Sequence, residues 1–235
     1  MEFCKQKTSF RVQPQESLEQ QRRQQGRHGV LLPNSIRAII CGPSNSGKTH
    51  LMVSLLFHRN GVRFQNCHIY CKTLHQPKYR FVERVLRDMK GVTLEMFDRG
   101  EKVLPPEAIP ADSVVIFDDV SCENQNIVRD YFARGRHYGM DAFYLCQSYA
   151  RVPKHLIRDN VNLVMLFRQD DLNLQHIYND HVRNDMSLDT FRQMCKSVWS
   201  KDKYGYVVID LESDVSNGRY RRGLDEYWQC PKETE

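Results

Sequence analysis

The segment from Gly42 to Thr49, which reads GPSNSGKT, constrains the fold of this chain more than any other feature. It matches the pattern GxxxxGK[ST] at every fixed position. An apolar run at residues 36–41 precedes it, and residues 49–58 follow with apolar side chains at helical spacing. A strand, a glycine-rich loop and a helix in that order are the context that the pattern requires, so the sequence predicts a loop that binds phosphate groups.

Each residue type in this loop has an expected role. Glycines let the backbone turn tightly, so that its N–H groups point inward at an anion. Lys48 is expected to reach the β and γ phosphates of a nucleotide, and the Thr49 hydroxyl to ligate Mg²⁺. The Asn-Lys-x-Asp sequence that selects guanine is missing, which favours ATP. The expected binding residues are Gly42, Pro43, Ser44, Asn45, Ser46, Gly47, Lys48, Thr49 and His50.

A second anchor for a nucleotide and its metal is expected where the apolar strand 114–117 ends in Asp118 and Asp119. We assign Asp118 to the magnesium shell and Asp119 to polarising the attacking water. Adjacent carboxylates repel each other unless a metal or a base compensates. The plainer alternative is a strand end that carries two solvated acids.

Gln147 follows the apolar run 142–146, and it is expected at the same sheet edge, where its amide can sense the γ-phosphate.

One lysine neutralises the charge of the transition state poorly, and many such enzymes recruit an arginine from a neighbouring subunit. Arg134, Arg136 and Arg158 are the candidates. The alternative for each of them is a solvated arginine or one that lies at a helix C-terminus, without a role in catalysis.

Alternation of strand-like and helical patterns predicts an α/β fold with a mostly parallel sheet and helices on both faces. Three parts are expected: a basic, Gln-rich and mobile arm at 1–33, a P-loop domain at 34–213 and a weakly structured tail at 214–235. Besides 36–41 and 114–117, the expected strands are 67–72, 92–97, 142–147, 162–167 and 206–211. The expected helices are 49–58, 77–89, 124–136, 170–181 and 187–199.

Composition is that of a soluble globular protein, because the 235 residues are 40% hydrophobic and 27% charged, and an intracellular protein is expected because the chain starts without the apolar block of a signal peptide. Without a long apolar run or a signal peptide, we expect no membrane partner. The eight cysteines are expected as reduced thiols, and a zinc site of Cys67, His68, Cys71 and His75 lacks the usual ligand spacing. Up to Arg37 there are seven basic residues against three acidic ones, typical of either a phosphate-gripping arm or a solvated tail.

Three segments together resemble the viral DNA-packaging ATPases of the FtsK-HerA superfamily, in the poxvirus-type branch shared with other large DNA viruses, virophages and Polinton-like elements. They are GPSNSGKT, VVIFDDV and YFARGRHYGMDAFYLCQSYARVPKHLIRDN, and the resemblance runs from about residue 37 to residue 167. It implies a RecA-like P-loop ATPase that forms a ring, a pentamer or a hexamer, and pumps double-stranded DNA into a preformed capsid. The implied partners are double-stranded DNA and capsid or portal components, and the implied location is the nucleus or virus factory of a host cell, or the virion.

Residue roles also follow from the resemblance. Lys48 and Thr49 take the Walker A role, Asp118 and Asp119 the Walker B role, and Gln147 the sensor role. Arg136 falls in a stretch, residues 134–137, that the resemblance places at a subunit interface. Members of the superfamily commonly carry Glu as the second acid, whereas this chain has the shorter Asp119.

Two other functions share the loop motif. A monomeric P-loop kinase would transfer the phosphate to a small acceptor, but no acceptor or lid signature is visible and the paired acids favour hydrolysis. A regulatory nucleotide-binding module would hydrolyse slowly and signal through its loops. Both remain alternatives to the motor at this stage.

Overall fold

The computed structural model describes residues 26–98, 103–120, 125–155 and 157–228. Within them, nine strands form one sheet in the order β3-β2-β4-β5-β1-β6-β7-β8-β9. The pairs from β3 to β6 are parallel, and those from β6 to β9 are antiparallel. The strands are β1 (Arg37–Cys41), β2 (Asn66–Cys71), β3 (Thr93–Phe97), β4 (Ser113–Asp118), β5 (Met140–Cys146), β6 (Leu163–Leu166), β7 (Val207–Asp210), β8 (Tyr220–Arg222) and β9 (Glu226–Tyr227).

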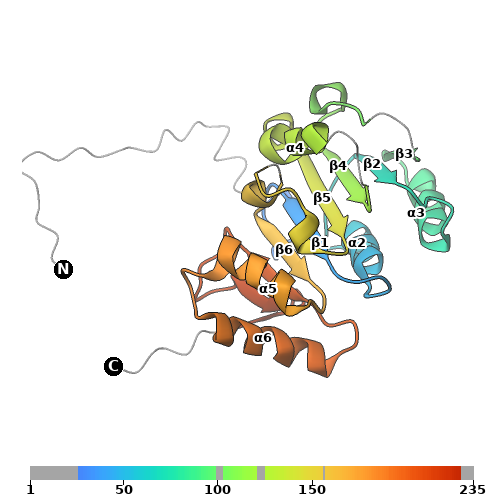
Figure 1. The fold of residues 1–235 in the computed structure, drawn as a ribbon. Helices are drawn as coiled ribbons and strands as arrows, with labels where there is room; N and C mark the ends of the chain where they lie inside the picture. Colours follow the sequence, from blue (N-terminus) through green and yellow to red (C-terminus); the bar gives the residue numbers. More distant parts are fainter. Residues whose placement is uncertain (1–25, 99–102, 121–124, 156, 229–235) are drawn as a thin grey trace, which may run out of the picture.

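Helices flank this sheet on both faces (Figure 1). They are α2 (Lys48–Phe57), α3 (Pro77–Asp88), α4 (Gln125–Arg134), α5 (Asp171–Ile177) and α6 (Leu188–Lys201), with short turns η1 (Pro106–Ala108), η2 (Gly135–Tyr138), η3 (Tyr149–Arg151), η4 (Arg158–Asn160) and η5 (Tyr178–Val182). None of the helices in the described ranges is long and apolar enough to cross a bilayer.

Two apolar cores, one on each face, hold the layers together. Successive residues of the central strands point to opposite faces, so that Ile39 joins the core with α4, α5 and α6 while Ile40 joins the core with α2 and α3. Phe117 and Ile116 divide in the same way on β4. Burial on both faces explains the unbroken apolar runs of these strands, and the predicted parallel α/β layering is confirmed.

The amino-terminal boundary differs from the expected mobile arm at 1–33. Residues 1–25 lie outside the described residues, but 26–33 pack against the domain. His28 is 3% exposed, and the Arg27 guanidinium donates to the Gly139 carbonyl at 2.7 Å. Both side chains also lie within 3.3 Å of the fully buried Asp141 carboxylate, which needs cationic or hydrogen-bonding neighbours at that depth.

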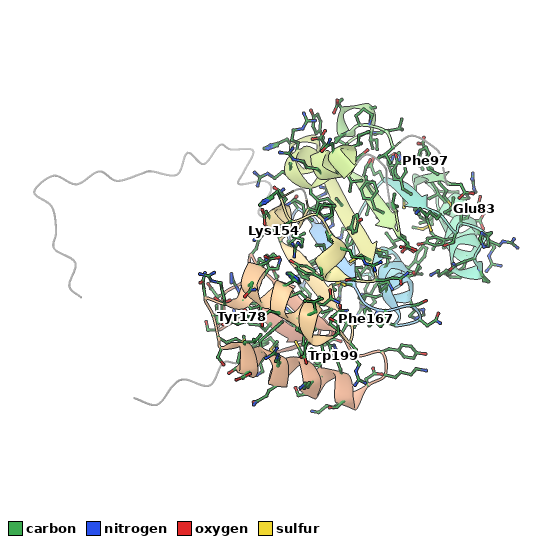
Figure 2. The ribbon with its side chains drawn as sticks, in the orientation of Figure 1. Glu83, Phe97, Lys154, Phe167, Tyr178 and Trp199 are labelled. Atoms are coloured by element: carbon green, nitrogen blue, oxygen red, sulfur yellow. The ribbon has the colours of Figure 1, made fainter. Side chains whose placement is uncertain are left out.

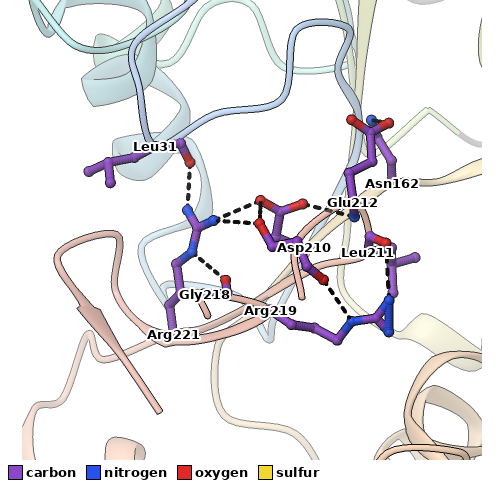
Figure 3. Close-up of polar contacts among 9 residues, drawn as sticks. Leu31, Asn162, Asp210, Leu211, Glu212, Gly218, Arg219 and Arg221 are labelled. Carbon is purple, nitrogen blue, oxygen red and sulfur yellow. Dashed lines mark hydrogen bonds and ion pairs between the residues drawn. The ribbon is translucent and has the colours of Figure 1, made fainter. Parts of the chain in front are cut away.

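The expectation of a weakly structured tail at 214–235 is wrong for residues 214–228, where β8 and β9 continue the sheet. Tyr220 is fully buried, and Arg221 donates to Asp210 at 2.7 Å and to the Leu31 carbonyl at 2.6 Å (Figure 3). The basic sequence around Arg221 resembled a solvated segment, because nothing in it reveals that Asp210 neutralises the arginine inside the protein. Residues 229–235 lie outside the described part.

Candidate active site

Three strand ends converge at the carboxyl edge of the sheet. The loop follows β1, the acidic pair ends β4, and Gln147 follows β5, which lies between the other two strands. Because all three strands run parallel, their ends meet on one side. The Thr49 hydroxyl donates to Asp118 Oδ2 at 3.4 Å, so the loop and the acidic strand share one site.

These residues line a cavity of about 660 Å³. The structure brings into it all the predicted loop residues except Gly42 and Pro43, together with Asp118, Asp119 and Gln147. Its full lining is Ser44, Asn45, Ser46, Gly47, Lys48, Thr49, His50, Thr73, Gln76, Lys78, Asp118, Asp119, Leu145, Cys146, Gln147 and Tyr204.

Glycine is required at both ends of the loop. Gly47 has φ 107°, the left-handed conformation that begins α2. A Cβ atom on Gly42 would lie 2.6 Å from Cβ of Phe167 and 2.6 Å from Oγ of Ser46, which is closer than real contacts allow. The Gly42 amide also donates to the Cys146 carbonyl at 3.1 Å, which fixes the loop against β5.

The Lys48 ammonium lies at the mouth of the loop. It donates to the carbonyls of Gly42 at 2.7 Å and Pro43 at 2.9 Å. Burial lowers the pKa of Lys48, and the nearby Asp118 carboxylate opposes that shift. A cation held in this partly desolvated position attracts an anion more strongly than one in water does.

Oxygen atoms suited to Mg²⁺ meet at Thr49 and Asp118. Both residues are 7% exposed, and a hydroxyl beside a carboxylate is the hard donor set that Mg²⁺ prefers. The residues present therefore fit the metal that the sequence motifs imply. Tyr79 from α3 donates its hydroxyl proton to Asp118 Oδ2. Burial and the same carboxylate raise the pKa of Tyr79, so it remains a donor.

The two acids have different surroundings, which limits their mutual repulsion. Asp118 is buried, whereas Asp119 is exposed and has φ 53°, a left-handed conformation. The Asp119 amide donates to the Leu145 carbonyl at 3.2 Å, and this bond ties the turn to β5. Asp119 and Gln147 thus face the same cavity from adjacent strand ends.

None of the three candidate arginines lines this cavity. Arg136 is exposed in η2, which precedes β5, and the seven residues of that strand separate it from Gln147 by roughly 20 Å. Arg134 pairs with Asp130 on its own helix at 3.1 Å. Arg158 is buried and held by Asp180 at 2.9 Å, which makes it an interior ion pair and removes it as a candidate.

A second cavity of about 550 Å³ adjoins the first and shares Gly47, His50 and Tyr204 with it. Leu51, Ser54, Phe167 and Tyr206 complete a mostly apolar lining. The rings of Phe167 and Tyr206 lie 5.4 Å apart. Trp199 from α6 donates to the Leu166 carbonyl at 3.1 Å and so holds the strand end that presents Phe167 (both residues are labelled in Figure 2).

Sequence reasoning missed the aromatic side chains of this second cavity, and also Lys78 and Tyr79 on α3. Lys78 Nζ donates to Thr49 Oγ1 at 2.8 Å, in the middle of the predicted metal site. Tyr79 had the signature of a core residue, since it lies on the apolar stripe of an amphipathic helix. No sequence signal marked either residue as part of the site.

The zinc alternative does not match the geometry. His68 faces Glu95 at 3.4 Å, while Cys67 and Cys71 lie in the core on the side of α2 and α3. Among the described residues, no three His, Cys, Asp or Glu side chains gather into a metal-binding group. The five described cysteines are all free thiols.

One strand, β5, separates the strand that leads into the loop from the strand that ends in the acidic pair. This sheet order and the phosphate loop together define a RecA-like P-loop NTPase fold. The chain is similar to the genome packaging NTPase B204 of Sulfolobus turreted icosahedral virus 2. With the sulfate complex the TM-score is 0.53 at 12% identity, covering 80% of this chain and 95% of that one.

Two further solved structures have the same fold. The B204 complex with ATP-gammaS has a TM-score of 0.50 at 11% identity and covers 80% of this chain and 96% of that one. B204, the DNA-packaging ATPase from Sulfolobus turreted icosahedral virus, has a TM-score of 0.50 at 13% identity, with coverages of 79% and 95%. No family model and no curated protein matches the sequence.

Proposed function

We propose that this chain is an ATP-hydrolysing motor that assembles into a ring, a pentamer or hexamer, and translocates double-stranded DNA to package a viral or virus-like genome. Its partners would be DNA, further copies of itself, and capsid or portal components. The observation that carries the proposal is the meeting of Thr49 and Asp118, because it joins the phosphate loop and the acidic strand in one site.

The loop amides and Lys48 would hold the β and γ phosphates. Thr49 and Asp118 would hold Mg²⁺, which supplies charge neutralisation between those phosphates when it is bound. Asp119 is exposed in the same cavity and would accept a hydrogen bond from the attacking water. Gln147, on the adjacent strand end, would orient that water and lose the contact when the γ-phosphate departs.

The adenine base would occupy the apolar cavity beside the loop. That cavity opens from Gly47 and His50, next to the phosphate cavity, so one ligand can fill both. Tyr204, Tyr206 and Phe167 supply flat apolar surfaces of the kind on which a purine stacks. Among the described residues, none that lines this cavity is an acid able to receive the amino and imino groups of guanine, which supports ATP over GTP.

Two observations favour a motor over a kinase or a slow regulatory module. The similar solved structures are described as genome packaging or DNA-packaging enzymes, and the shared fold spans nearly their whole chains. The exposed Arg136, which does not line the cavity of its own copy, is our candidate for an arginine that a neighbouring copy supplies.

The decisive experiment is an ATPase assay with and without long duplex DNA, at low and at high salt. We expect DNA to accelerate hydrolysis, and the acceleration to shrink as salt rises because phosphate contacts release counterions. Lys48→Ala protein is the control for contaminating activity. One unchanged rate with and without DNA at both salt concentrations would exclude the motor.

Ring assembly has its own tests. Sedimentation with ATP should show a larger species than sedimentation without nucleotide, whereas the sedimentation of a monomeric kinase would not change.

If Arg136 acts across the interface, mixing Arg136→Ala subunits with Lys48→Ala subunits should restore part of the activity that each lacks alone. Absence of rescue at every mixing ratio would remove Arg136 from the mechanism.

A further inference from the structure

Lys78, the second residue of α3, occupies an unexpected place in the site. Its ammonium donates to Thr49 Oγ1 at 2.8 Å, and the Thr49 hydroxyl in turn donates to Asp118 Oδ2 at 3.4 Å. The lone-pair side of the Thr49 oxygen therefore faces an ammonium group. This is the side through which a hydroxyl oxygen ligates a metal ion.

Lys78 and a divalent cation cannot share this position. A metal on Thr49 would bind the same oxygen that accepts from Lys78, and two like charges so close together repel each other. Lys78 must therefore leave Thr49 if Mg²⁺ binds there. A flexible four-carbon stem allows such a movement, since Lys78 is an exposed residue, and its ammonium also lies 5.6 Å from the centroid of the Tyr79 ring.

The charge of the cavity indicates where the ammonium would go. Lys48 and Lys78 both line it, together with the carboxylates of Asp118 and Asp119. With Mg²⁺ bound at Asp118, the two lysines and the metal would outweigh the two carboxylates, and such a site suits a polyanion. Lys78 also lies at the Thr49 and Asp118 end, whereas the apolar cavity opens from Gly47 and His50, so the phosphate farthest from the base is the one within its reach.

We propose that Lys78 is a second phosphate-positioning cation, which competes with Mg²⁺ for Thr49 Oγ1 and moves to the terminal phosphate of ATP when the metal binds. This inference rests on the proposed ATP site, and it adds a residue that none of the recognised motifs contains. It predicts that Lys78 distinguishes ATP from ADP, and that it sets how much Mg²⁺ the site requires.

The test is equilibrium binding of ATP and of ADP to the full chain, in EDTA and across a Mg²⁺ titration. At saturating Mg²⁺, where Lys78 has left Thr49, Lys78→Gln should weaken ATP binding about tenfold, the loss of one charge-assisted hydrogen bond, while ADP binding changes little. At fixed ATP, the Mg²⁺ concentration for half-maximal binding should fall, because the competing ammonium is gone. Lys78→Arg should retain most of the ATP preference.

Lys90→Gln is the matched control, since it makes the same change at an exposed lysine just after α3. Melting temperatures close to wild type for all three variants would verify their folding. The inference is overturned if Lys78→Gln binds ATP at saturating Mg²⁺ as tightly as Lys90→Gln does, if ATP and ADP weaken equally, or if the Mg²⁺ requirement does not change. If wild-type protein itself binds no ATP, the proposed function fails together with this inference.

Discussion

Arg221→Met should be among the most destabilising single substitutions outside the apolar core. The guanidinium donates to the carbonyls of Gly218 and Leu31, each at 2.6 Å, and to Asp210 Oδ2 at 2.7 Å. The side chains of Arg221 and Asp210 are 9% and 6% exposed. Methionine fills a similar volume, but it leaves the buried Asp210 carboxylate without its cation and the two carbonyls without the donor that Arg221 supplies.

Removing one partner of a buried ion pair costs about 3 to 5 kcal/mol. In a domain of this size, 1 kcal/mol corresponds to about 2 to 4 °C in Tm, so we expect a decrease of roughly 6 to 20 °C. The assay is thermal unfolding followed by circular dichroism. The neighbouring Arg222→Met is the matched control, because Arg222 pairs with Glu226 at the surface and its loss should leave Tm almost unchanged.

A double-mutant cycle separates the ion pair from the carbonyl contacts. Asp210→Asn removes the negative charge, so the combined Arg221→Met and Asp210→Asn variant should lose less stability than the two single changes added together. Strict additivity would mean that Asp210 and Arg221 do not interact energetically. A Tm for Arg221→Met equal to that of Arg222→Met would refute the reasoning for the whole cluster.

Four further outcomes can be checked in solution. Lys48→Ala should abolish ATP binding in an equilibrium binding assay, because the loop loses its cation. Asp119→Asn should leave ATP affinity intact and lower kcat by about 100- to 1000-fold, the cost of removing a group that acts on the transition state; comparable turnover would remove Asp119 from the mechanism. Tyr204→Ser should weaken ATP and ADP by the same amount, about 1 to 3 kcal/mol, if the base stacks there. Burial lowers the pKa of His181 to about 4 from an ordinary 6.5, so the free energy of unfolding should fall as pH falls from about 6.5 to about 4, and His181→Gln should flatten that part of the urea-unfolding profile.

Local signals predicted the central half of the fold well. Strands β1, β4 and β5 contain the apolar runs 38–41, 114–117 and 142–146 because each is buried on both faces, and such runs can be recognised without knowing their neighbours. The phosphate loop is equally local, since its function depends on consecutive backbone amides. Asp118 and Gln147 followed from a general rule, that parallel strands end at one edge.

Residues that act through distant partners could not be predicted in this way. In the sequence, Arg221 has the pattern of a solvated arginine, because its partners Asp210 and the Leu31 carbonyl are brought to it only by the fold. Tyr204 and Tyr206 acquire a role only because the chain returns to the loop after α6, about 155 residues later in the sequence. Lys78 has no recognisable spacing from Thr49, because only the tertiary fold brings α3 into contact with α2.

The left-handed backbone at Asp119 bears on the choice of acid at that position. Apart from Gly, the residues that tolerate positive φ are mainly Asn and Asp, because their short polar side chains can bond to the adjacent main chain. A longer acid would reach farther toward a water molecule, but it would strain the tight turn that leaves β4. Asp119 therefore fits the left-handed turn without strain, although its carboxylate extends less far toward a water molecule than that of glutamate would. Asp119→Glu would alter the geometry of the turn as well as the position of the carboxylate.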